Sequence, residues 1–250
     1  MNALEFDDEF RLNYQYAGGN SAPGFNAYAR SLFLTRAQEE LVKDAFDPTS
    51  NNKNKGFEQN ETRRRQLSNL VKQFIFYPSI AVPYDLNLNI DNNSLLYTAA
   101  SELNVLRIIH EHIVVDPTIC KKNTLPVVPI THDEYNDLKN NPFRRPGIER
   151  AWRIDQGTID DSNNYLEIVA DIPYIRYVLR YVRRPRPIIV ADLTSISNAS
   201  YSIEGQTTVQ TSEINEAFHP EIVTRAVTNA LESVGDPRLQ MHLLKDQRIE

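Results

Sequence analysis

The sequence predicts an α+β fold in which helices from both ends of the chain form one body, with an antiparallel β-rich domain inserted between them. Apolar residues recur at helical spacing near both ends and alternate at period two in the middle. The middle part also has spacings too short for repeated βαβ crossovers. We expect four parts: an extended arm over 1–24, a first helical part over 25–90, the inserted domain over 91–195, and a linker with closing helices over 196–250.

The composition is typical of a soluble globular protein, because 41% of the 250 residues are hydrophobic and 24% are charged. A formal net charge of −6 argues against a protein that binds nucleic acid by charge alone. Cys120 is the single cysteine, so no disulfide can form within the chain. The acidic start is unlike a signal peptide and no apolar run has transmembrane length. We therefore expect synthesis in the cytosol and no membrane contact.

The first 24 residues are polar and rich in glycine and asparagine around Tyr14 and Tyr16, which favours an extended arm with little packing of its own. Such an arm is either mobile or ordered by a neighbouring molecule.

Two helices are predicted next. The capping-box pattern Thr35-Arg36-Ala37-Gln38 opens the first helix, which ends at Asp47-Pro48. Asn60 caps the second helix after a polar loop over residues 49–56. The apolar stripes are Ala37, Leu41, Val42, Ala45 and Phe46 in the first helix, and Leu67, Leu70, Val71 and Phe74 in the second.

Strand patterns dominate the middle of the chain. The expected strands are Leu103–Val115, Trp152–Ile154 and Tyr165–Val169. A second capping box, Thr131 to Glu134, starts a short helix that ends at Asn141-Pro142. The stretch Tyr174–Leu193 reads as a long alternating strand, a break at Arg183-Arg184-Pro185-Arg186-Pro187, and a short buried strand at Ile188-Ile189-Val190.

The last part begins with a Ser/Thr/Asn-rich linker or loose hairpin over residues 195–211. Pro220 then starts a helix with a wide apolar stripe that includes Val227 and ends at Gly235. Asp236-Pro237 opens one more helix. We expect the Pro220–Val234 helix to pack on the helix that carries Leu67, Leu70 and Phe74.

Few residues suggest catalysis. His110 and His112 share one strand face, and a third metal ligand could come from His132, Asp133 or Glu134. The alternative, which we favour, is a polar pair on the sheet surface. The acidic groups Asp7-Asp8-Glu9 and Asp160-Asp161 suit solvated positions, and Cys120 beside Lys121-Lys122 has no assignable histidine partner. Phosphate-loop, dinucleotide and nucleophile-elbow motifs are missing. We expect no catalytic residue, no bound metal and no cofactor.

Clustered arginines are the better candidates for function. Each cluster either pairs with carboxylates or phosphates of a partner or forms a solvated face. Pro185 and Pro187 stiffen the last cluster, which suits recognition of a partner; plain solvent exposure is the alternative. The candidate partner-binding residues are Arg63, Arg64, Arg144, Arg145, Arg183, Arg184 and Arg186.

Four ordered stretches carry a resemblance that covers residues 22–234. They are Ala22-Pro23-Gly24 with Tyr28 and Ser31 to Val42; Pro129 to Tyr135 with Asn141 to Arg144; Tyr181 to Ile189; and His219 to Val227. Together they resemble a structural protein of the head–tail connector, or neck, of crAss-like bacteriophages.

The resemblance implies a virion structural protein and no enzyme. Identical subunits would form a ring, dodecameric to match a portal, that contacts the portal and adjoining neck or tail proteins. Double-stranded DNA would pass through the ring without sequence-specific binding. The stiff arginine cluster from Arg183 to Arg186 would then lie at a subunit interface or on the adjoining ring, with the DNA channel as an alternative. Two alternatives stay open: a metal-dependent nuclease or processing enzyme that uses His110 and His112, and a soluble accessory binding protein that uses the arginines.

Overall fold

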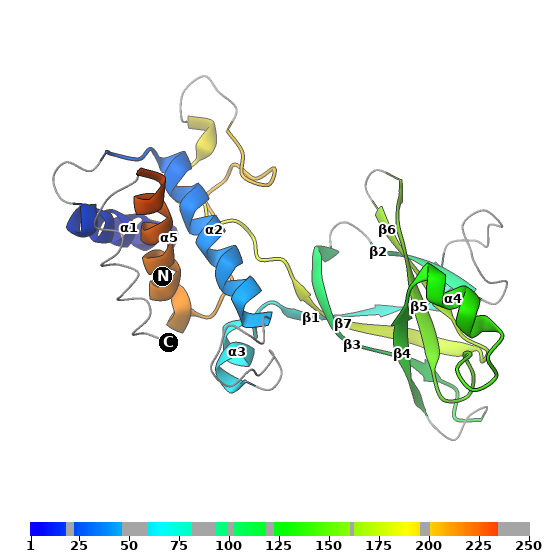
Figure 1. The fold of residues 1–250 in the computed structure, drawn as a ribbon. Helices are drawn as coiled ribbons and strands as arrows, with labels where there is room; N and C mark the ends of the chain where they lie inside the picture. Colours follow the sequence, from blue (N-terminus) through cyan, green and yellow to red (C-terminus); the bar gives the residue numbers. More distant parts are fainter. Residues whose placement is uncertain are drawn as a thin grey trace. The chain divides into compact units, whose positions relative to one another are not determined.

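The computed structural model describes residues 1–18, 23–46, 60–81, 94–99, 103–118, 123–160, 163–195 and 201–234 (Figure 1). The chain divides into two compact units. A helical unit comprises residues 1–70 and 185–250, and a β unit comprises residues 71–184. The fold is therefore α+β, as predicted, and the helical unit is built from both ends of the chain. The loop over 49–56, Cys120, Asp161 and the predicted helix after Gly235 lie outside the described residues.

Among its described residues, the helical unit contains four α-helices. They are α1 (Ala3–Gly18), α2 (Ala27–Phe46), α3 (Glu61–Gln66) and α5 (His219–Val234). Helix α5 packs against α2 and α1 (Figure 1). Its buried face carries Ile222, Val223, Ala226, Val227, Ala230 and Leu231, which is the apolar stripe expected from the sequence. None of the helices in the described ranges is long and apolar enough to cross a membrane.

The start of the chain corrects the prediction of an extended arm, because residues 3–18 form α1. The physical reason is an apolar stripe at helical spacing that is buried in the unit. Its members are Ala3, Phe6, Phe10, Tyr14 and Ala17. The polar residues that suggested an arm lie between them.

Helix α2 starts eight residues earlier than predicted, at Ala27, and the Asn26 side chain accepts a hydrogen bond from the Ala29 N–H at 2.8 Å. Thr35 therefore lies inside the helix and does not cap its start, contrary to the prediction. Asn60 caps α3 as predicted, accepting from the Thr62 N–H at 3.0 Å. That helix ends at Gln66, so the predicted stripe through Val71 and Phe74 is wrong.

Among its described residues, the β unit has seven strands, which form one sheet of order β1-β7-β3-β4-β5-β6-β2. Val71 and Phe74 belong to its first strand because they pair with β7. The strands are β1 (Val71–Phe76), β2 (Ser94–Ala99), β3 (Val105–Val115), β4 (Thr124–Ile130), β5 (Ala151–Asp160), β6 (Asn163–Val169) and β7 (Tyr174–Arg183).

The sheet is antiparallel, as expected, except between β4 and β5. These two strands are parallel and are joined through α4 (His132–Lys139), so one βαβ crossover is present where the prediction allowed none. The predicted capping box at Thr131 and Glu134 is confirmed at the start of α4.

The larger hydrophobic core of the β unit lies on one face of this sheet. Tyr177, Leu179 and Tyr181 of β7 point into it, as the alternation predicted. The two edge strands meet there, since the rings of Phe76 on β1 and Tyr97 on β2 have centroids 5.2 Å apart. The opposite face of β7 carries Arg176 and Arg180 in solvent and Val178 and Val182 in buried positions.

Candidate interaction surfaces

The basic elbow, residues 183–187, lies where the chain leaves the β unit and re-enters the helical unit. Arg183 ends β7, and the Arg184 N–H donates to the Asn104 carbonyl at 2.8 Å. The Arg186 guanidinium is 62% exposed and lies 3.6 Å from the Glu213 carboxylate. Pro185 and Pro187 are buried. The prolines thus anchor the elbow while the Arg184 and Arg186 side chains reach solvent.

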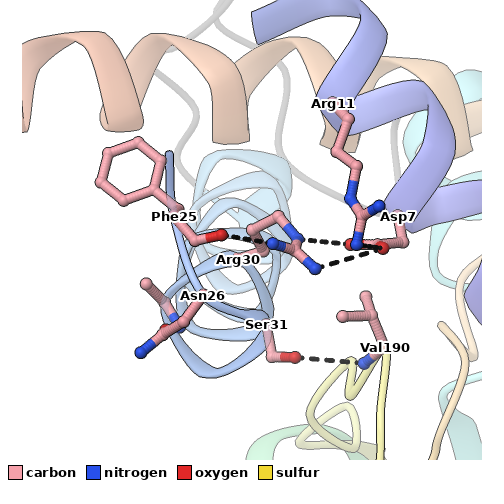
Figure 2. A network of polar contacts seen from close by, with 8 residues as sticks. Asp7, Arg11, Phe25, Asn26, Arg30, Ser31 and Val190 are labelled. Atoms are coloured by element: carbon pink, nitrogen blue, oxygen red, sulfur yellow. Dashed lines mark hydrogen bonds and ion pairs between the residues drawn. The ribbon is translucent and has the colours of Figure 1, made fainter. Parts of the chain in front are cut away.

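The segment after the elbow lies along α2 and is held by buried polar side chains of that helix. Gln38 Nε2 donates to the Arg186 carbonyl at 2.8 Å, and Thr35 Oγ1 accepts from the Ile188 N–H at 3.1 Å. Ser31 Oγ accepts from the Val190 N–H at 3.1 Å, as Figure 2 shows. On the other edge, Ile189 exchanges two backbone hydrogen bonds with Gln210. Three α2 residues therefore bind the chain where it returns from the β unit.

A buried ion pair joins α1 to α2. Arg30 Nε lies 2.5 Å from Asp7 Oδ1, and Arg11 lies 2.6 Å from the other oxygen of the same carboxylate (Figure 2). The Arg30 guanidinium also donates to the Phe25 carbonyl. Asp7 therefore has a structural role, whereas the sequence suggested a solvated position.

The three arginines of α3 differ in exposure: one is buried and two are exposed. Arg63 is buried and donates to the Ala45 carbonyl at 3.2 Å, so it ties α3 to the end of α2. Arg64 is exposed, and Arg65 forms an exposed ion pair with Glu61 at 2.7 Å. Only the exposed members of this cluster have side chains that a partner can reach.

The outer face of the sheet is basic around β3 and β7. His110 lies opposite Arg180, and the rings of His110 and His112 are 5.3 Å apart on the same face. Burial lowers the pKa of His112, and His110 and Arg176 lower it further. In the part of the chain that the structure describes, no group of three or more metal-binding side chains is present. The third candidate, His132, instead lies 3.3 Å from the Asp155 carbonyl oxygen.

A second buried ion pair crosses the β unit, and the sequence analysis missed it. Glu111 accepts from Arg153 Nη1 at 2.9 Å and from the Tyr177 hydroxyl at 2.8 Å. Burial raises the pKa of Glu111, whereas Arg153 and the Tyr177 hydroxyl lower it. The sequence contains a signal that Glu111 is buried, because strand alternation places it on the same face as the core residues Ile113 and Val115. Both oxygens of the Glu111 carboxylate accept a hydrogen bond within the β unit, which suits a structural pair.

Arg144 and Arg145 lie in the loop between α4 and β5, where both are exposed. They are close in sequence to Phe143, an aromatic residue that is 89% exposed. The candidate residues are therefore distributed over both units: Arg144 and Arg145 belong to the β unit, whereas Arg63, Arg64 and Arg186 belong to the helical unit.

Comparison with known proteins identifies the family. The family described as phage tail ring protein 3/4 matches residues 1–237. Ring protein 4/5 of Bacteroides phage crAss001 is 34% identical over 227 residues, which cover 91% of this chain and 91% of the relative. Ring protein 3 of the same phage is 29% identical over 239 residues, or 92% and 95% of the two chains. The chain belongs to the phage tail ring protein 3/4 family. It is thus a crAss-like ring protein and a structural component of a bacteriophage virion, which confirms the resemblance.

Proposed function

We propose that this chain is one subunit of a homo-oligomeric ring in the head–tail connector, between the portal and the tail. Genomic DNA passes through the ring during ejection. The observation that carries this proposal is the extent of the family match, since residues 1–237 include both the helical unit and the β unit. The role is structural, without catalysis.

The distribution of charge supports this role. The helical unit has 14 Lys and Arg against 19 Asp and Glu, a net charge of −5, whereas the β unit has 13 against 14. A negative subunit lets DNA slide through a channel without holding it. Neighbouring copies, with the portal and adjoining neck or tail proteins, supply the partners. A dodecameric ring would match the portal.

The exposed arginines are the proposed partner-binding groups. Arg184 and Arg186 project from a stiff elbow, and a stiff segment loses little entropy when it docks. Guanidinium groups pair bidentately with carboxylates, which the acidic neighbouring subunits provide.

The test of the elbow is a phage that carries Arg183→Ala, Arg184→Ala and Arg186→Ala. We expect the subunit to fold normally and its incorporation into virions to fail. Normal virions with slowed genome ejection would assign the elbow to the channel. Normal virions with normal ejection would contradict both roles.

The test of the ring itself is mass spectrometry of purified virions followed by cryo-electron microscopy of the neck. We expect the protein in the virion, with density for a closed ring between portal and tail that fits both units. A stable monomer that is absent from virions would overturn the proposal.

A further inference from the structure

The loop after α4, residues 140–150, holds a large aromatic side chain in solvent. Phe143 is 89% exposed and Ile148 is 67% exposed. The loop carries three arginines, at 144, 145 and 150, against one acid, Glu149. Aromatic residues, phenylalanine included, and arginine are both enriched in protein interfaces relative to the rest of the surface. We call residues 140–150 the Phe143 loop.

Internal hydrogen bonds and two prolines restrict the backbone of the Phe143 loop. The Asn141 side chain accepts from the Phe143 N–H at 3.0 Å, and its carbonyl accepts from the Arg144 and Arg145 N–H groups at 3.1 and 2.9 Å. The Gly147 N–H donates to the Arg150 carbonyl at 3.1 Å, and two prolines restrict the backbone. A loop fixed in this way loses little entropy on docking.

A complementary surface lies on α1, on the face opposite its buried stripe. Leu4, Leu12 and Tyr16 are 71%, 67% and 87% exposed and recur at spacings of eight and four residues. The acidic residues Asp8 and Glu9 lie among them. The only basic side chain of α1, Arg11, is paired with Asp7 at 2.6 Å. The outer face of α1 is therefore apolar and negative, whereas the Phe143 loop is apolar and positive.

We propose that the Phe143 loop of one copy docks on the outer face of α1 of the next copy. The proposal deepens the ring function above and rests on it. A closed ring needs two different surfaces of each subunit that fit one another, and these two surfaces differ and match in both charge and apolar character. Phe143 supplies the anchor, and Arg144 and Arg145 pair with Asp8 and Glu9.

The first test is charge reversal in the phage. Arg144→Glu with Arg145→Glu, and separately Asp8→Lys with Glu9→Lys, are each expected to lower incorporation into virions at least about tenfold, which corresponds to about 1.4 kcal/mol. The four changes together are expected to restore incorporation. Circular dichroism of each purified variant establishes that it folds. Folded variants without restoration overturn the proposal, as does normal incorporation with slowed ejection, which would place the loop against DNA.

The second test locates the contact. In a Cys120→Ser background, one tagged copy carries Leu12→Cys and a differently tagged copy carries Phe143→Cys. Mild oxidation of assembled virions is expected to link the two tags. Val209→Cys, at a residue 52% exposed, replaces Leu12→Cys in the matched control. Linkage no greater than in the control overturns the docking proposal. If imaging finds no ring of the wild-type protein, the proposed function itself fails; a ring without linkage removes only the docking proposal.

Discussion

The hydroxyl of Thr35 provides the most direct test of how the returning chain is held on α2. Thr35 is buried, and its Oγ1 accepts from the Ile188 N–H at 3.1 Å and donates to the Ile188 carbonyl at 3.3 Å. Thr35→Val keeps the side-chain volume and has a similar helix propensity, so the change removes these two hydrogen bonds and little else. An orphaned buried N–H costs about 1–3 kcal/mol and a lost net hydrogen bond about 1 kcal/mol. We expect the free energy of unfolding to fall by about 2–3 kcal/mol.

The assay is urea unfolding of the full chain, followed by circular dichroism at the helical band. The helical unit contains α1, α2, α3 and α5, so this signal reports mainly on that unit, while fluorescence of Trp152 reports on the β unit. With a denaturant slope of about 2–3 kcal/mol per M, the helical midpoint should fall by about 1 M. Thr224→Val is the matched control, because the Thr224 hydroxyl donates to the Pro220 carbonyl of its own helix, at 3.0 Å, and so holds no returning segment. A Thr35→Val midpoint that moves no further than the control midpoint would refute the reasoning.

Three further predictions concern the cores and the histidine pair. Val227→Asp places an unpaired charge at a site 1% exposed and should cost about 3–5 kcal/mol; an unchanged melting temperature would remove Val227 from the core. Arg153→Met should cost a similar amount. Without Arg153, the pKa of Glu111 rises further above its ordinary 4.5, so the folded state binds more protons than the unfolded state. The free energy of unfolding should therefore fall as the pH rises above 4.5. Adding Glu111→Gln to this variant should abolish the pH dependence of the urea midpoint measured by Trp152 fluorescence. His110→Ala and His112→Ala should leave virion assembly and metal content unchanged by elemental analysis, and loss of a stoichiometric metal from either variant would contradict this.

Sequence periodicity predicted the elements whose structure is determined by residues close together in the sequence. The alternation in β7, the capping box at Thr131 and the apolar face of α5 all depend on residues within a few positions of one another, and all three appear as expected. The same periodicity misplaced the stripe from Leu67 to Phe74. Leu67 and Leu70 are buried in the helical unit, whereas Phe74 pairs with Leu179 in the sheet, so one apolar pattern serves two units.

The candidate site was less predictable because its determinants are distant in sequence. Arg63 and Arg64 look alike in the sequence, yet the carbonyl at the end of α2 makes Arg63 a buried structural group. Glu111 and Arg153 are 42 positions apart, and only the order of strands in the sheet brings them together. Exposure of Phe143 was likewise not visible in the pattern, since an aromatic residue after proline suits a buried turn equally well.

The prolines of the elbow acquire a physical explanation from the contact with α2. Thr35 lies about 6 Å further along the helix axis than Ser31, and Ile188 lies about 6.6 Å from Val190 along an extended chain. The spacing on the helix therefore matches the spacing on the segment, and both hydrogen bonds can form. From Thr35 to Gln38 the helix rises only about 4.5 Å, and the longer glutamine side chain spans the remaining distance to the Arg186 carbonyl. Only even-numbered residues of the segment face α2, so Pro185 and Pro187 lie where α2 requires no N–H. A slip of one residue would set Pro187 against Thr35 and leave the hydroxyl without a donor. The polar face of α2 and the two prolines therefore fix one register for the chain as it returns from the β unit.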